Sequence, residues 1–381
     1  MQEYNTIIGK LLSGINRKKF KRIVDKYKGD FAVKKLSCWE QFVAVFLGQI
    51  TGAGTLREIV DLIKFHSNQQ YHLGIKKDIA RSTLAKANET RDWRIYRDIF
   101  VELVSKMQKT EYYQTTQLVK IIDSTPTYLK IIQHPWIETT MKVKGLKTHV
   151  VYDLTNEIPV YFDITGARTN DITKAKEIEI DKGVMYVFDK GYMDYKWWND
   201  IAQTGAYFVT RLKVNSAIIE LDEVKKHSEM ISSQLIKLKP SHHGKDKNCN
   251  QILKRVIVQR ENDTPLVLVT NDINRSSEEI ADLYKSRWQI ELFFKWIKQN
   301  LKIKKFLGRS ENAIKTQICI AMISFVLLRM AEELKTVCGE ISIKNLLKII
   351  GNSLFNCLRI RECGRKHYKN PNQLQFAWTF T

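Results

Sequence analysis

Two short apolar segments each end at an aspartate, and these aspartates are the first residues with recognisable chemistry. Residues 118–122 precede Asp123, and residues 184–188 precede Asp189. Both segments have the length and composition of buried strands, which would place each carboxylate at a strand end. A third carboxylate, Glu291, lies on a helix predicted over residues 280–303. Carboxylates supply the hard oxygen ligands that Mg²⁺ prefers, and two such ions about 3.5–4 Å apart catalyse phosphoryl transfer.

The predicted helix over residues 280–303 carries two neighbouring stripes. With 100° per residue, one arc of about 60° holds only apolar side chains, those of Leu283, Ile290, Phe294, Ile297 and Leu301. An adjacent arc of about 60° holds a phenol, two cations and a carboxylate, those of Tyr284, Arg287, Lys298 and Glu291. The apolar stripe should face the core and place Glu291 at its edge. An ordinary amphipathic helix with an Arg287–Glu291 ion pair is the alternative.

The charge balance indicates an anionic partner. The chain has 381 residues, 44% of them hydrophobic, and a net charge of +21 from 62 Lys and Arg against 41 Asp and Glu. A well-packed chain with this excess most often serves a polyanion, with nucleic acid first and a membrane surface second. The longest apolar run, residues 318–328, is too short to span a bilayer, and the N-terminus lacks the features of a signal peptide. We therefore expect a cytoplasmic protein that does not bind a membrane.

The cysteines and histidines give no metal site. None of the six cysteines forms a CxxC pair, and Cys357, Cys363 and His367 have the wrong spacing for zinc and lack a fourth ligand. We expect reduced thiols. His242 and His243 are interpreted as loop residues.

The elements that must position the carboxylates follow an α/β order. Residues 118–122, 147–154, 159–165, 184–188 and 206–212 are predicted strands, and residues 170–180 and 195–203 are predicted helices. The order β-β-β-α-β-α-β is that of an RNase H-like mixed-sheet core. Residues 213–270 contain two further predicted strands, 252–259 and 266–270, and we interpret them as an inserted β subdomain. Ser276 and Glu279 predict a capping box at the start of the next helix.

Helical regions flank this core. We divide the chain into a basic helical N-terminal DNA-binding region (1–112), a catalytic domain (113–310) interrupted by the β insertion, and a helical C-terminal region (311–381). Helices are predicted near residues 39–50 and 56–65, and a third begins near Ser82 as N-cap. The last two helices could form a helix-turn-helix or belong to a plain helical bundle, and both possibilities stay open.

Three motifs together resemble a known family. Tyr284, Arg287, Glu291 and Lys298 match the pattern Y-(2)-R-(3)-E-(6)-K, while Ile122-Asp123-Ser-Thr and Phe188-Asp189-Lys-Gly-Tyr resemble the motifs around two catalytic aspartates. This combination is similar to the bacterial insertion-sequence DDE transposases of the family named for insertion sequence four. The resemblance covers most of the chain, and a β insertion before the catalytic helix is also a feature of that family.

The resemblance implies a set of roles. Asp123, Asp189 and Glu291 would form the catalytic triad and hold two Mg²⁺ ions, for which Mn²⁺ would substitute. Tyr284, Arg287 and Lys298 would contact DNA near the cleaved end. The enzyme would bind terminal inverted repeats, hydrolyse phosphodiester bonds and transfer strands to target DNA, as a homodimer on DNA. Relatives often close the cut end as a hairpin, and some hold a flipped base with an aromatic residue. The sequence does not indicate which residue would hold the base in this chain.

Two other functions remain possible from the sequence. One is a DNA-binding repressor derived from a transposase, against which the three intact carboxylates count. The other is a stand-alone RNase H-like nuclease, against which the long insertion and the basic N-terminal region count.

Overall fold

The computed structural model describes residues 6–107, 118–130, 132, 134, 136, 145–213, 216–239, 249, 251–261, 263–301, 306–331 and 343–355. His242, His243, Cys357, Cys363 and His367 lie outside these residues. The chain forms two compact units, one from residues 1–103 and 299–381 and one from residues 104–298. The regions before and after the catalytic core thus pack as one helical unit. That the N-terminal region binds DNA by itself stays a prediction.

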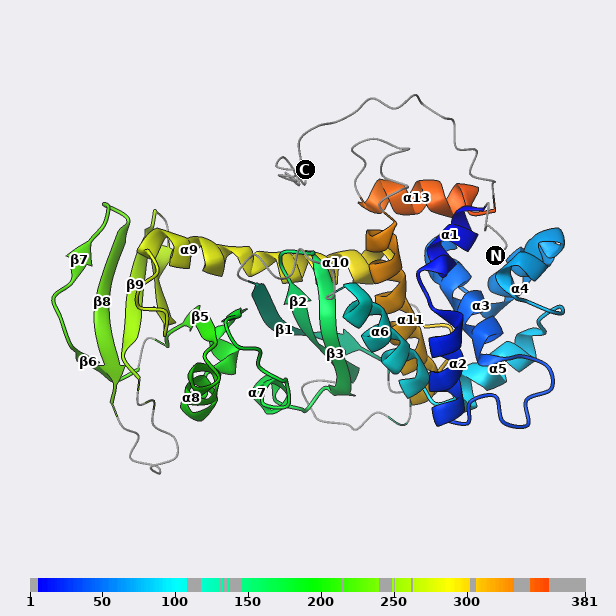
Figure 1. Ribbon diagram of the computed structural model, residues 1–381, viewed down its shortest axis with the longest axis horizontal. Coiled ribbons are helices and arrows are strands. Elements are labelled where there is room, and N and C mark those ends of the chain that lie inside the picture. Colours follow the sequence, from blue (N-terminus) through cyan, green and yellow to red (C-terminus); the bar gives the residue numbers. More distant parts are fainter. Residues whose placement is uncertain are drawn as a thin grey trace, which may run out of the picture. The chain divides into compact units, whose positions relative to one another are not determined.

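The helical unit is built around two buried helices, α3 (Cys38–Thr51) and α11 (Glu311–Met330), which contact each other. Ser37 and Glu40 form a capping box that starts α3. The other helices described here are α1 (Ile7–Ser13), α2 (Arg17–Lys26), α4 (Leu56–Phe65), the 3₁₀ helix η1 (Ser67–Leu73), α5 (Arg81–Thr90), α6 (Arg94–Met107) and α13 (Ile343–Ser353). Figure 1 shows them in blue, cyan and orange.

Helix α11 contains the apolar run of residues 318–328, and it is longer than that run. The prediction that the run is too short to span a bilayer therefore needs correction. The helix has 20 residues and, by length and composition alone, could cross a membrane. However, 83% of its apolar window is buried inside the protein, where it packs against α1, α3, α5 and α13. It is therefore a core helix of the helical unit, and its burial decides this rather than its length.

The helix-turn-helix expectation is wrong in its geometry. Residues 66–80 separate α4 from α5 and include η1, whereas this motif joins its helices by about 3–4 residues. Helix α5 begins at Arg81 with Ala80 as N-cap, so Ser82 is not the cap. The predicted bounds of these two helices, 65 and 82, already left a connection of this length, and η1 occupies part of it.

The second unit contains one ten-stranded mixed sheet. Its order is β3-β2-β1-β4-β5-β10-β9-β8-β6, with β7 paired to β8. Strands β1, β4 and β5 are parallel neighbours, and the other pairs are antiparallel. The strands are β1 (Val119–Tyr128), β2 (Gly145–Asp153), β3 (Ile158–Gly166), β4 (Met185–Phe188), β5 (Tyr207–Arg211), β6 (Ile218–Glu220), β7 (Lys225–Lys226), β8 (Ile231–Leu238), β9 (Leu253–Arg260) and β10 (Asp263–Thr270). The predicted α/β class with a large mixed sheet and flanking helices is confirmed.

Several elements differ from their predicted form. Strand β1 continues past Asp123 to Tyr128 because β2 pairs with it along its whole length, so Asp123 lies inside a strand. The helix predicted over residues 170–180 shortens to α7 (Asp171–Ala175). The β insertion continues the core sheet, since β10 pairs with β5. Strands β6, β7 and β8 were not predicted.

Helices cover both faces of this sheet (Figure 1). On one face, α8 (Tyr195–Gln203) places Trp197 and Trp198 against Phe188 and Phe208. On the other face lie α9 (Ser277–Ser286) and α10 (Trp288–Asn300), and Phe293 of α10 contacts the ring of Tyr152. The predicted single helix thus divides at Arg287, whose N–H bonds to the carbonyl three residues before it, that of Tyr284 (3.1 Å). As a result Tyr284 is buried and Leu283 only half-buried.

Candidate active site

Strand register brings Asp123 and Asp189 to the same place. In the parallel pair β1–β4, Ile121 lies opposite Val187 and Ile122 opposite Phe188, so each aspartate follows the last paired residues. Neighbouring strands lie about 4.8 Å apart, and side chains alternate between the two faces. Both carboxylates therefore lie on the same face as Ile121 and Val187. This is the face that α9 and α10 cover.

Arg287 connects two of the predicted catalytic carboxylates. Its Nη1 lies 3.6 Å from Oδ2 of Asp123, and its Nη2 donates a hydrogen bond of 2.5 Å to Oε1 of Glu291. The division of the helix at Arg287 positions this guanidinium between the sheet and α10. The Arg287–Glu291 pair expected for an ordinary amphipathic helix exists, but Arg287 also contacts the half-buried strand residue Asp123, so the pair is more than a surface contact.

Tyr284 and Lys298 complete the same face. The Tyr284 hydroxyl donates to Oδ1 of Asp189 at 3.3 Å. Nζ of Lys298 donates to Oγ1 of Thr125 at 2.5 Å and to the carbonyl of Pro126 at 3.0 Å. Thr125 is two residues beyond Asp123 and therefore on the same side of β1. All six predicted site residues thus lie at one face of the sheet, although their roles stay predictions.

The electrostatics of the site favour an incoming cation. Burial raises the pKa of Asp123 to about 6; the backbone N–H of Ser124 and Arg287 oppose this, and the carboxylates of Glu291 and Asp189 add to it. Burial, together with the carboxylate of Asp189, raises the pKa of Tyr284 to about 12. Carboxylates that raise one another's pKa gain stability from an added positive charge. In this structure, Arg287 supplies part of that positive charge.

The donor set fits divalent ions in its chemistry. Three carboxylates offer the hard oxygen ligands that Mg²⁺ prefers. Within the part of the chain that the structure describes, however, no three Asp, Glu, His or Cys side chains are already arranged as a metal site. Arg287 pairs with two of the three carboxylates, so metal binding requires these carboxylates to exchange a guanidinium for the ion. Their convergence within about 4–8 Å, inferred from the two-metal spacing, stays a prediction.

A second polar cluster lies on the opposite face of β1, and the sequence analysis missed it. The Ser124 hydroxyl donates to Oδ1 of Asp171 at 2.6 Å. Nζ of Lys147 lies 3.1 Å from this oxygen and Nδ1 of His149 lies 3.5 Å from it. The register pairs Ser124 with His149. Because Asp123 and Ser124 are adjacent on a strand, their side chains point to opposite faces of the sheet. The partners of Ser124 lie on other elements, His149 on β2 and Asp171 on α7, and only the folded structure identifies them.

Tyr192 is a further buried group of this region. Burial raises the pKa of its phenol well above the usual range, and the carboxylates of Asp123, Asp171 and Asp189 add to that effect. Its ring packs against Phe188, the residue before Asp189. In the sequence, only its place in the Phe188-Asp189-Lys-Gly-Tyr192 motif indicated that Tyr192 lies near the site.

Two family models match parts of this chain. Residues 114–327 match the family described as Transposase DDE domain. Residues 3–76 match a Domain of unknown function (DUF4372). The first match covers more than half of the chain and includes Asp123, Asp189 and Glu291.

Individual relatives come from several bacteria. The y4zB protein of Sinorhizobium fredii, described as a transposase, is 37% identical over 260 residues, 67% of this chain and 72% of that protein. A Geobacillus stearothermophilus protein described as the transposase of insertion sequence element IS5377 is 27% identical over 65% of this chain and 66% of its own length. The IS231E transposase of Bacillus thuringiensis is 23% identical over 55% of each chain.

One solved structure was also similar. The piggyBac transposase synaptic complex with hairpin DNA superimposes with a TM-score of 0.45 and 14% identity, over 91% of this chain and 77% of that chain.

A mixed sheet that aligns two aspartates beneath a helix with a glutamate defines the class of DDE enzymes. This chain belongs to the DDE transposases of insertion sequence elements, as the sequence resemblance predicted. Enzymes of this family generally depend on divalent metal ions.

Proposed function

We propose that this protein is a cytoplasmic cut-and-paste transposase that binds the terminal inverted repeats of its element and cleaves and joins DNA with Asp123, Asp189 and Glu291. The observation that carries this proposal is the β1–β4 register, which aligns the two aspartates on the face covered by Glu291. The substrates are duplex DNA at the element ends and at the target. Two ends must be held together, so the active form on DNA is a homodimer.

The three carboxylates would hold two Mg²⁺ ions, or Mn²⁺ in their place. When bound, these ions supply the charge that activates the attacking hydroxyl and stabilises the leaving oxygen. Arg287 holds Asp123 and Glu291 ready in the absence of metal. Released from these carboxylates, the guanidinium would be able to bind a phosphate beside the cleaved bond.

Tyr284 and Lys298 would position the DNA. Lys298 is anchored to β1 by Thr125 and Pro126, so its charge stays beside Asp123. Tyr284 bonds to Asp189 and keeps that carboxylate oriented toward the site. Both residues lie where a phosphate next to the scissile bond would pass.

The decisive experiment separates binding from chemistry. Asp189→Asn keeps the shape of the side chain and removes the ligand charge, so we expect normal end binding and loss of cleavage with Mg²⁺ or Mn²⁺. Asp200→Asn, at an exposed position of α8, is the matched control and should cleave normally. Wild-type cleavage rates in Asp189→Asn would contradict the triad.

The same assay distinguishes the alternatives. A wild-type protein that binds ends but never cleaves would be a repressor. Cleavage of unrelated duplexes at equal rates, without strand transfer, would indicate a stand-alone nuclease.

A further inference from the structure

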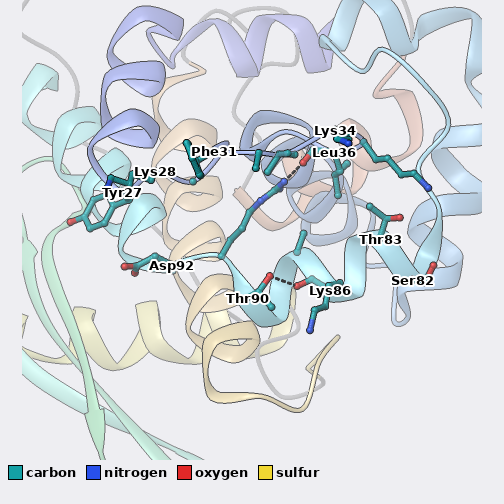
Figure 2. Close-up of a pocket in the computed structure, with 16 residues that line it drawn as sticks. Tyr27, Lys28, Phe31, Lys34, Leu36, Ser82, Thr83, Lys86, Thr90 and Asp92 are labelled. Carbon is teal, nitrogen blue, oxygen red and sulfur yellow. Dashed lines mark hydrogen bonds between the residues drawn. The ribbon is translucent and has the colours of Figure 1, made fainter.

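A hollow in the helical unit lies between the loop after α2 and helix α5. Its volume is about 750 Å³, and its lining comes from residues 27–29 and 31–36, residues 82, 83, 86, 87 and 90 of α5, and residues 91 and 92 beyond it. Figure 2 shows Lys28, Phe31 and Lys34 of the loop at one border and Ser82, Thr83 and Lys86 of α5 at another. All of the lining belongs to one compact unit.

The hollow is strongly positive. Five of its lining residues are basic and one is acidic, namely Lys28, Lys34, Lys35, Lys86 and Arg91 against Asp92. The single acid is already paired, since Oδ2 of Asp92 lies 2.6 Å from Nη2 of Arg94. The four lysines are exposed, whereas Arg91 is buried and donates to Gln41 at 2.9 Å. Nζ of Lys86 also lies 3.6 Å from Oε2 of Glu89, so Lys28, Lys34 and Lys35 carry most of the net positive charge that the hollow offers to an anion.

Lys28 occupies a backbone position that favours glycine. It follows the C-cap of α2 with φ of 51°, and its N–H bonds to the carbonyl of Asp25 at 3.0 Å. The next N–H, that of Gly29, bonds to the carbonyl of Val24 at 2.9 Å. These two bonds form a Schellman motif, in which the left-handed residue is most often glycine. A lysine at this position carries backbone strain and adds a positive charge to the hollow.

An aromatic side chain stands among these lysines. Phe31 is 80% exposed, so its ring is open to a partner that binds the lysines. Proteins that bind duplex DNA use such apolar side chains against sugars and base edges in the minor groove.

The start of α5 offers further donors. Ala80 gives this helix no side-chain cap, and uncapped N–H groups at a helix N-terminus bind phosphate. Ser82 and Thr83 add hydroxyl groups at the same border. Cations, hydroxyls and backbone N–H groups are the donors that proteins direct at the phosphate backbone of DNA.

We infer that this hollow, defined by Lys28, Phe31, Lys34, Lys35 and Lys86, is a duplex-DNA-binding surface of the helical unit. The inference rests on the proposed transposase function and deepens it. It also gives a role to part of the region that matches a domain of unknown function, residues 3–76. Its lysines grip the phosphate backbone, and Phe31 contacts the groove.

The test uses the full chain without divalent metal and a fluorescent random-sequence DNA duplex, because phosphate contacts carry little sequence information. Binding is measured across a salt series. For Lys34→Gln/Lys35→Gln, the slope of log affinity against log salt should shrink by about 1.8, which is 0.9 for each lost contact. The control Lys64→Gln, at an exposed position of α4 outside the hollow, should keep the wild-type slope.

Two more variants give independent readouts. Lys28→Gly should lower the slope by about 0.9 while its thermal midpoint stays equal or rises, because glycine relieves the left-handed strain. Phe31→Ala should weaken binding at every salt concentration without changing the slope.

Wild-type slopes in both lysine variants, or an equal loss in Lys64→Gln, would overturn the inference. Cleavage by the wild-type protein with Mg²⁺ is measured separately. A protein that cleaves normally but has unaltered slopes refutes only this inference, whereas one that binds through the hollow but never cleaves refutes only the proposed function.

Discussion

Nη1 of Arg287 lies 3.6 Å from Oδ2 of Asp123, and this contact joins the end of α9 to the middle of β1. The same guanidinium bonds to Glu291. The side chains of Asp123, Arg287 and Glu291 are 20%, 18% and 35% exposed, so water screens this group less than it screens a surface pair. Arg287 thus supplies the positive charge between two carboxylates that the proposed metal ions would otherwise supply.

Removing this guanidinium should destabilise the metal-free protein and strengthen its response to metal. In Arg287→Ala, Asp123 and Glu291 lose their shared counter-charge, which should cost about 1–3 kcal/mol. Mg²⁺ no longer competes with the guanidinium, so it should raise the thermal midpoint more in the variant than in the wild type. Thermal unfolding with and without Mg²⁺ measures both effects.

Arg275→Ala provides the control for this prediction. Arg275 pairs with Asp272 at 2.9 Å in the same unit, and its loss should lower stability without changing the shift caused by Mg²⁺. An equal Mg²⁺ shift in wild type and Arg287→Ala would show that Arg287 does not occupy the metal position.

Arg287 and Lys298 should each contribute one phosphate contact at the catalytic face. Alanine at either position should lower the slope of log affinity against log salt by about 0.9, similarly for different end sequences. Lys285→Ala, on the exposed side of α9, should not. Unchanged slopes would remove both residues from the DNA-binding surface.

His149 should make stability depend on pH. Burial lowers the pKa of His149 to about 4 from 6.5, and the Asp171 carboxylate opposes this. Between pH 6.5 and 4, the unfolded chain therefore binds more protons than the folded chain. The stability that comes from keeping His149 neutral is fully present above pH 6.5 and is lost as the pH falls toward 4. His149→Gln should reduce the loss of unfolding free energy from pH 7 to pH 4 by about 3 kcal/mol.

Denaturant unfolding at a series of pH values measures this difference. Thr165→Val serves as the control, because it removes the hydroxyl that lies 2.8 Å from Nε2 of His149 but keeps the titrating ring. The control should retain the pH dependence. A His149→Gln profile parallel to the wild type would contradict the prediction.

Gly145 should be essential for the pairing of β1 with β2. A Cβ at this position would lie 2.0 Å from the carbonyl oxygen of Thr127, and its φ is +148°. Gly145→Ala should therefore destabilise the fold by about 1–3 kcal/mol or more. Gly166→Ala, where a Cβ would meet nothing within 4 Å, should change stability by less than about 0.5 kcal/mol. Thermal or denaturant unfolding compares the two, and equal stabilities would refute the steric argument.

The sequence by itself determined the elements that depend on local pattern. Residues 56–65 and 195–203 were predicted as helices and are α4 and α8, because amphipathic spacing and caps are local signals. The capping box of Ser276 and Glu279 was also visible locally and is present. The strand that ends before Asp189 was found because four consecutive buried residues, Met185–Phe188, read as an apolar run.

Only the tertiary structure decided how far β1 extends and which groups surround Asp123. Pairing with β2 carries β1 on to Tyr128, since a strand's length depends on hydrogen bonds from a partner distant in sequence. The β10–β5 pairing likewise merged the predicted insertion with the core sheet. Alternation along β1 then directs Asp123 toward Arg287 and Ser124 toward Asp171. Charge and residue type are local properties, whereas burial and contacts between distant segments exist only once the sheet and its helices have formed.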